Sequence, residues 1–151
     1  MMSTILTNLN RRPPFEEIFM DLAKSVSQRS TCARLNVGTT ITSVDFRKVL
    51  AIGYNGNASG LHNGCDREGS GVCGCLHSEN NAIINCDCPR STEKIVFVTH
   101  VPCQMCAKAL INLGNVKKVY YANLYRDLTS LTFFDQVGIL HEHFTGIAKT
   151  E

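Results

Sequence analysis

The sequence predicts an α/β domain of three layers, in which helices cover both faces of a central, mixed, five-stranded sheet. Strand-like and helix-like segments alternate along the second half of the chain, which is typical of parallel strands joined by helices. Near the start, two strand-like segments separated by a short turn predict an antiparallel hairpin. The chain has no internal repeat, linker or low-complexity stretch, so residues 1–151 are expected to form a single domain.

Four segments have the pattern of helices. Pro13 and Pro14 open the first, because proline suits the first turn of a helix. Its apolar residues recur at helical spacing and form one stripe, namely Phe15, Ile18, Phe19, Leu22 and Val26. Pro89 lies just beyond the second helix, which it cannot continue, and Gly114 ends the third. The predicted helices are 15–28, 77–85, 103–113 and 127–137.

Five apolar segments are expected to be strands, and Asp45 and Phe46 form the tip of the hairpin between the first two. The predicted strands are 37–44, 48–54, 94–99, 117–122 and 139–144. The segment 53–60 is a loop by its glycine-rich composition. It directly follows a strand and precedes the residues suited to bind metal, which favours contact between this loop and a ligand.

Composition narrows the classes of function. The net charge of +2 is too small for a surface that binds long nucleic acid, although one or two cations suffice for a small anion. No apolar run approaches the roughly 20 residues of a membrane span. Residues 1–10 lack the pattern of a signal peptide, so we expect a cytoplasmic protein. In that reducing compartment, eight cysteines indicate metal binding or catalysis before disulfides.

The chemistry is concentrated in two short motifs, His77-x-Glu79 and Pro102-Cys103-x-x-Cys106. A catalytic zinc site uses three nitrogen or sulfur ligands and leaves the fourth position to water. His77, Cys103 and Cys106 supply three such ligands. Each motif opens a predicted helix, whose positive N-terminal dipole favours thiolate and hydroxide. The spacing therefore predicts a hydrolytic zinc site of the kind found in nucleobase deaminases.

Glu79 is the expected proton carrier of this site. Residues two apart on a helix do not share a face, so Glu79 can lie beside the water without binding the metal. Zinc makes water a nucleophile at neutral pH, and the attack would fall on the ring carbon that carries the amino group. Glu79 would then move protons to the ring nitrogen and to the departing ammonia.

With these motifs in view, the chain resembles the deoxycytidylate (dCMP) deaminases of the cytidine deaminase superfamily. The zinc motifs are shared by the whole superfamily, whereas the Gly-Tyr-Asn-Gly loop, the Cys-x-Arg segment and the long insert before His77 are typical of the deoxycytidylate branch. Where the superfamily usually has His-Ala-Glu, this chain has Ser78, a small residue that we expect not to disturb the site. The matching stretches are 29–34, 37–38, 53–56, 77–83, 99–106 and 125–126.

The resemblance implies hydrolysis of dCMP to dUMP, which would supply thymidylate synthesis. It also implies that four residues bind the substrate, namely Asn55, Arg126, Tyr125 and Pro102. Asn55 would hold the sugar hydroxyl or phosphate. Arg126, which follows Tyr125, would bind the 5′-phosphate, because arginine forms strong charge-assisted hydrogen bonds with phosphate. Pro102 would line the base pocket, and His100 would have a structural role before the zinc cysteines.

Members of this family are typically homohexamers activated by dCTP with Mg²⁺ and inhibited by dTTP. By resemblance, the Gly-Tyr-Asn-Gly loop would be the regulatory element, with Asn57 and Arg34 as candidates for contacts with the triphosphate. An effector of this kind must bind one of two loop states better than the other.

Some members also carry a second, structural zinc. The resemblance assigns Cys32 and Cys65 to it, and Cys73 and Cys75 would complete the tetrahedral set, with His62 as the substitute for one of them. A metal would order the insert at 61–75, which has little apolar material of its own. The alternative is a group of free, buried thiols. Cys86 and Cys88 form a weak C-x-C signal, and we expect neither to be a ligand.

Three other functions remain open. A tRNA adenosine deaminase shares both zinc motifs but should have a basic surface for the RNA backbone. A free cytidine deaminase has no use for a phosphate-binding arginine. A non-catalytic zinc-binding module would close the first site with a fourth protein ligand and would give Glu79 no role.

Overall fold

In the computed structural model, residues 11–66 and 73–146 are described. Residues 1–10, on which the expected lack of a signal peptide rests, lie outside these ranges, as does the part of the predicted insert at 67–72. Within the described ranges no helix is both long and apolar enough to cross a membrane.

All five predicted strands belong to one sheet, in the order β2-β1-β3-β4-β5. Strand β1 pairs antiparallel with both β2 and β3, while the pairs β3–β4 and β4–β5 are parallel. The expected mixed, five-stranded sheet is therefore confirmed. The strands are β1 (Gly38–Ser43), β2 (Val49–Tyr54), β3 (Lys94–His100), β4 (Val116–Asn123) and β5 (Leu140–His143).

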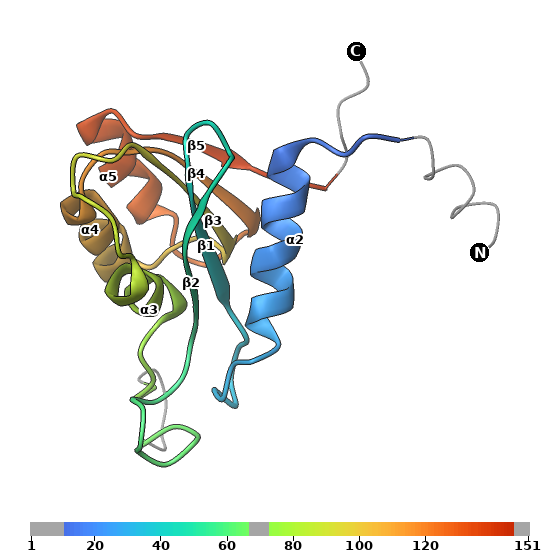
Figure 1. Ribbon diagram of the computed structural model, residues 1–151. Helices are drawn as coiled ribbons and strands as arrows, with labels where there is room; N and C mark the ends of the chain where they lie inside the picture. Colours follow the sequence, from blue (N-terminus) through green and yellow to red (C-terminus); the bar gives the residue numbers. More distant parts are fainter. Residues whose placement is uncertain (1–10, 67–72, 147–151) are drawn as a thin grey trace.

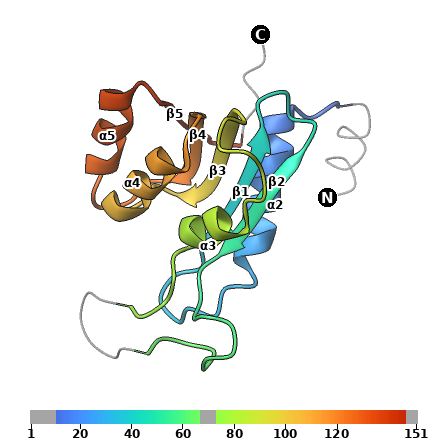
Figure 2. The ribbon, with the colours of Figure 1, turned by 60° about the vertical axis from the view of Figure 1, so that its left-hand side comes forward.

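The helices lie on both faces of this sheet, as expected for three layers (Figure 1). One face is covered by α2 (Phe15–Ser27), and the other by α3 (Ser78–Asn85), α4 (Gln104–Leu113) and α5 (Thr129–Val137). Figure 2 shows the same separation from a second direction. Element bounds differ from the sequence-based ones by one or two residues. At α3 and α4 the difference arises because His77 and Cys103 cap their helices instead of beginning them.

Each face of the sheet has its own apolar core. Beneath α2, Phe19 packs against Phe97, whose ring stacks on Tyr120 at 5.0 Å between centroids. On the opposite face, Val96 and Val98 of the same strand pack with residues of α4 and α5. Because both of its faces are covered, β3 is buried along nearly its whole length.

The apolar stripe predicted for the first helix was partly wrong. Phe15 and Ile18 are 48% and 44% exposed, whereas Met20 and Ala23 are fully buried. The helix crosses β1 and β3 with the face that holds Phe19, Met20, Ala23 and Val26. Both stripes have helical spacing, and contact with the sheet selects between them.

Helix α3 lies unusually close to the sheet at Gly53 of β2. A Cβ atom at this position would overlap the carbonyl oxygen of Ser78 and the amide nitrogen of Ala82. The Asn81 side chain also donates a hydrogen bond to the carbonyl oxygen of Tyr54 at 2.8 Å. The first turn of α3, which follows His77, is therefore held against the sheet by backbone contact.

Candidate active site

His77 and Cys103 occupy equivalent places at the N-termini of two neighbouring helices. Each is the N-cap residue, with extended backbone, of α3 and α4 respectively. The Cys103 sulfur accepts the backbone N–H of Cys106 at 3.4 Å. Two helix N-termini thus face one set of ligands, and their dipoles favour negative charge there.

The three predicted ligands meet at one point, with their ligand atoms within 4.8 Å of one another. His77 Nδ1 lies 3.5 Å from Cys103 Sγ and 3.3 Å from Cys106 Sγ. Bond lengths of about 2.0 Å to nitrogen and 2.3 Å to sulfur place tetrahedral ligands about 3.5 Å apart. The donor set therefore fits zinc in both chemistry and spacing.

The two thiols of this group differ in their pKa. Hydrogen bonds from Cys106 and His77 lower the pKa of Cys103 to about 4, so this sulfur is a thiolate at neutral pH. The adjacent Cys103 and burial raise the pKa of Cys106. A bound metal ion would displace the proton that Cys106 retains, because only the thiolate is a ligand.

Glu79, in the first turn of α3, is only 4% exposed. Burial raises the pKa of its carboxyl group, and a 2.6 Å hydrogen bond from Ser78 opposes that shift. Sequence reasoning missed this contact, because the sequence does not show which way the hydroxyl of Ser78 points. The contact places a hydroxyl group directly on the candidate proton carrier.

A pocket of about 350 Å³ opens above these residues. Among the residues predicted to bind substrate or effector, Asn55, Tyr125 and Arg34 line it, together with ligands of both cysteine groups. Pro102 is buried beside the pocket, whose wall at that point is formed by Val101. Its full lining is Cys32, Arg34, Leu35, Val37, Asn55, Cys73, Cys75, His77, Ser78, Glu79, His100, Val101, Cys103 and Tyr125.

The amide of Asn55 holds the pocket wall at residues 35–37. Its oxygen accepts the backbone N–H of Val37 at 2.9 Å, and its nitrogen donates to the carbonyl of Leu35 at 2.6 Å. Asn55 is 6% exposed, and these bonds use one of its two amide hydrogens.

Asn57 and Arg126 lie away from the pocket lining. The amide of Asn57 donates to the carbonyl of His62 and to the carboxylate of Asp66, within its own loop. The guanidinium of Arg126 is exposed and lies 5.9 Å from the centroid of the Tyr125 ring.

His100 lines the pocket, a position that its expected structural role did not include. Its Nδ1 lies 3.0 Å from the hydroxyl oxygen of Thr99, which also accepts the N–H of Gly38. We assign the proton of the neutral His100 ring to Nε2, because Nδ1 is then the acceptor that the buried Thr99 hydroxyl needs for its hydrogen. His100 therefore offers the pocket a hydrogen-bond donor. Its place at the end of a strand, just before the zinc cysteines, was the signal available in the sequence.

Cys32, Cys65, Cys73 and Cys75 form a second group of close ligand atoms. Tetrahedral zinc holds sulfur ligands about 3.8 Å apart. The Cys32 sulfur lies 3.8 Å from Cys65 and 3.5 Å from Cys73, and the Cys65 sulfur lies 3.6 Å from Cys75. The Cys65–Cys73 distance of 2.7 Å is shorter than this spacing, so these two sulfurs would separate around a metal ion.

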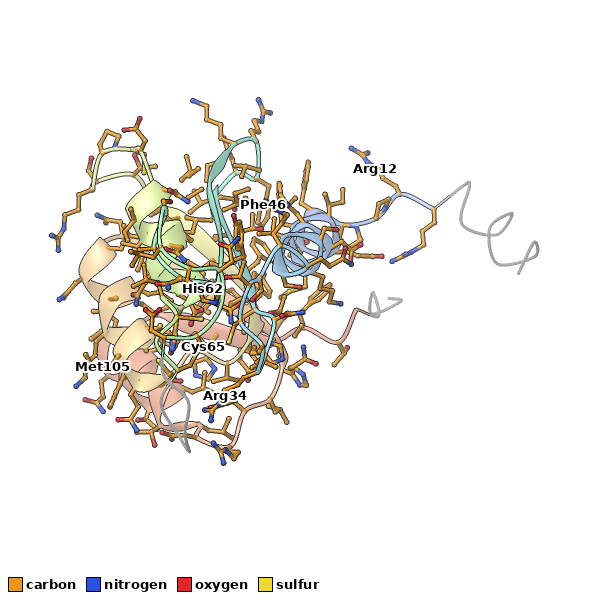
Figure 3. The ribbon with its side chains drawn as sticks, turned by 90° about the horizontal axis from the view of Figure 1, so that it is seen from below. Arg12, Arg34, Phe46, His62, Cys65 and Met105 are labelled. Atoms are coloured by element: carbon orange, nitrogen blue, oxygen red, sulfur yellow. The ribbon has the colours of Figure 1, made fainter. Side chains whose placement is uncertain are left out.

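His62 is not part of this group, which already contains four sulfurs. Figure 3 views the molecule from the end that carries these residues and labels Arg34, His62 and Cys65. Although burial opposes it, backbone N–H groups of Arg34 and Leu35 lower the pKa of Cys32 to about 7. Cys86 and Cys88 lie outside both groups, with their sulfurs 3.6 Å apart.

A mixed sheet that presents helix-capping His and Cys residues beside a buried glutamate has the features of a zinc-dependent hydrolase. Residues 14–123 match the family described as the cytidine and deoxycytidylate deaminase zinc-binding region. The chain belongs to this family.

Individual relatives agree with this result. The chain is 37% identical over 139 residues to ComE operon protein 2 of Bacillus subtilis, covering 87% of this chain and 71% of that protein. It is 30% identical over 148 residues to the deoxycytidylate deaminase of Schizosaccharomyces pombe, covering 89% of this chain but only 45% of that longer protein. The solved structure of dCMP deaminase from cyanophage S-TIM5 with dCMP and dUMP has a TM-score of 0.77 and 35% identity, covering 89% of this chain and 100% of that one.

Proposed function

We propose that the protein hydrolyses dCMP to dUMP and ammonia. The observation that carries this proposal is the position of Glu79, a buried carboxylate two residues from His77, at a pocket shared with Cys103. The choice of dCMP is supported by the cyanophage relative, which binds dCMP and dUMP and is covered over its full length.

The proposed ligands of the catalytic zinc are His77, Cys103 and Cys106. Zinc bound there would supply a Lewis acid that lowers the pKa of water to about 7. Glu79 would accept a proton from the attacking water and pass it to the ring nitrogen. It would then take the second proton from the hydroxyl group formed on the ring carbon and give it to the leaving amine. Burial raises the pKa of Glu79, which brings this carboxyl closer to the pH at which it must both accept and release protons.

Substrate binding is proposed for five residues around the pocket. Asn55 has one amide hydrogen left for the sugar, and Tyr125 with Pro102 and its neighbour Val101 would enclose the base. Arg126 follows Tyr125 and would reach the phosphate from the pocket rim, as a bidentate partner. Gln104 supports this rim, because it donates a 2.6 Å hydrogen bond to Asp127 in the same loop.

A second zinc, with a structural role, is proposed at Cys32, Cys65, Cys73 and Cys75. Four sulfurs close such a site, and the three longer sulfur–sulfur distances support tetrahedral coordination. The metal would join the segment at Cys32 to the insert that precedes His77.

Regulation and assembly are proposed from the family resemblance. They comprise activation by dCTP with Mg²⁺, inhibition by dTTP, a homohexamer and a cytoplasmic role in supplying thymidylate synthesis. Arg34 lines the substrate pocket and Asn57 lies in the adjacent loop, so contacts with a triphosphate at either residue would act close to the reacting centre.

The test is deamination by purified, zinc-loaded protein of dCMP, deoxycytidine and an adenosine-containing tRNA, with and without dCTP and Mg²⁺. We expect kcat/KM for dCMP to exceed that for deoxycytidine by at least about tenfold, since a phosphate-binding site discriminates by the contact it makes. Equal use of deoxycytidine would indicate a free cytidine deaminase, and turnover of tRNA alone would indicate an adenosine deaminase. No turnover of any substrate would favour the binding module.

A further inference from the structure

We propose that Thr39 and Ser78 form a chain of two hydroxyl groups that orients the Glu79 carboxylate, and that Ser78 is a positioning residue for the deamination. This inference deepens the proposed function and rests on the role given there to Glu79.

The geometry is that of a short, buried hydrogen-bond chain. The Ser78 hydroxyl lies 2.6 Å from Glu79 Oε1 and 2.8 Å from the hydroxyl of Thr39. Thr39 and Ser78 are fully buried, and Glu79 is nearly so. Water therefore competes little with either bond, which strengthens both.

The chemistry of the groups sets the direction of the chain. An ionised carboxylate only accepts hydrogen bonds, so the single hydrogen of Ser78 is donated to Glu79. The Ser78 oxygen is then the acceptor for the Thr39 hydroxyl. Both hydrogens point toward the carboxylate.

The chain starts from an interior strand of the sheet. Thr39 lies on β1, where its backbone pairs with Gly53 of β2 on one side and Val98 of β3 on the other. Ser78 is the first residue of α3, at the point where the helix touches Gly53. The sheet thus reaches the carboxylate through side chains as well as through the helix backbone.

This arrangement distinguishes the two oxygens of Glu79. Ser78 donates its hydrogen bond to Oε1, both when the carboxyl group is ionised and when it is protonated. The proton of the neutral carboxyl group is then carried by Oε2. Oε2 is therefore the oxygen that accepts and releases protons toward the pocket. Because the carboxyl group is held by Ser78 in both states, it does not rotate between the two proton transfers, and such orientation contributes to rate.

The first variant is Ser78→Ala, compared with wild-type protein for kcat, KM for dCMP, zinc content and melting temperature. We expect kcat to fall about tenfold, the size associated with one hydrogen bond to a charged group, with KM and zinc content unchanged. Ser78→Thr keeps a hydroxyl and should recover most of the lost kcat. A purely structural role would instead lower the melting temperature and zinc content without this dependence on the hydroxyl.

The second variant, Thr39→Val, preserves shape and removes only the hydroxyl that supports Ser78. We expect a smaller loss of kcat, and the double variant with Ser78→Ala should be no slower than Ser78→Ala alone, since the chain acts as one unit. The matched control is Thr40→Val, because the buried Thr40 hydroxyl on the same strand has no hydrogen-bond partner among the described residues. Its kcat should equal that of the wild type.

The outcomes separate this inference from the proposed function. Wild-type turnover of dCMP with unchanged kcat in Ser78→Ala would overturn the hydroxyl chain and leave the proposed function intact. Multiplicative losses in the double variant would also overturn it, because Thr39 and Ser78 would then act independently. A wild-type protein that deaminates no base would overturn both.

Discussion

Cys75 and His77 are separated by one residue in the chain, yet each belongs to a different group of potential metal ligands. Leu76 between them is held by two backbone hydrogen bonds with Gly56, of 2.8 and 3.0 Å. The two groups are therefore joined by a three-residue segment whose middle residue is paired with the loop at Gly56.

The first prediction concerns the group of four cysteines. Cys65→Ser should lower the zinc content from two ions to one per chain, measured by elemental analysis of purified protein. It should also lower the melting temperature, because a closed zinc site contributes directly to folding. Cys88→Ser is the control, since Cys88 belongs to neither group, and it should retain two ions. A wild-type protein with a single ion would contradict the second site.

Removal of the proton carrier should separate metal binding from turnover. Glu79→Gln keeps the size of the side chain and an acceptor for Ser78, so zinc content should not change. We expect kcat for dCMP to fall about a thousandfold, within the range for a positioned general acid or base. Glu142→Gln, an exposed carboxylate on β5, should leave kcat as in the wild type. Retained activity in Glu79→Gln would refute the proposed mechanism.

Arg126→Ala tests recognition of the phosphate. If Arg126 binds the 5′-phosphate, its removal should raise KM for dCMP about tenfold or more, the scale of a lost charge-assisted contact. Turnover of deoxycytidine, which has no phosphate, should be unaffected. Arg47→Ala at the hairpin tip serves as the control for loss of one positive charge. Equal losses on both substrates would remove the phosphate role from Arg126.

A fourth prediction addresses stability. Lys94 is fully buried, and its ammonium donates to the carbonyl oxygens of Arg90, Thr92 and Gly114 at 3.2, 2.7 and 2.9 Å. Lys94→Met should lower the free energy of unfolding by about 3 kcal/mol, because it leaves three carbonyl oxygens beside a buried side chain without their charged donor. The control is Lys117→Met, because the Lys117 side chain is exposed. It should change the free energy of unfolding by less than about 0.5 kcal/mol, and both variants are measured by denaturant titration.

The fold could be predicted from the sequence because the patterns that define its helices and strands are local. Strand alternation, helical spacing, Pro89 and Gly114 each act on their own segment, and all nine predicted elements are present. The exposure of Ile18 could not be predicted from the sequence, because the sheet that the helix contacts determines which of its two apolar faces is buried.

In the candidate site, too, some residues could be predicted from local sequence patterns and others could not. His77 and Cys103 stand out because their spacing to Glu79 and Cys106 is a local property of two helix starts. His100 and Ser78 do not, because their contacts depend on which loops and strands meet in space. The two hydrogen bonds of Asn55 to residues 35 and 37 likewise link segments about 20 positions apart.

The close approach at Gly53 limits how this protein can be redesigned. No side chain fits between β2 and the first turn of α3, which carries the pocket residues Ser78 and Glu79, so a substitution at Gly53 would displace both. The wall at 35–37 is held instead by hydrogen bonds to Asn55, and its residues are partly or largely exposed. A library intended to alter the accepted base or sugar should therefore vary this wall and leave Gly53 unchanged.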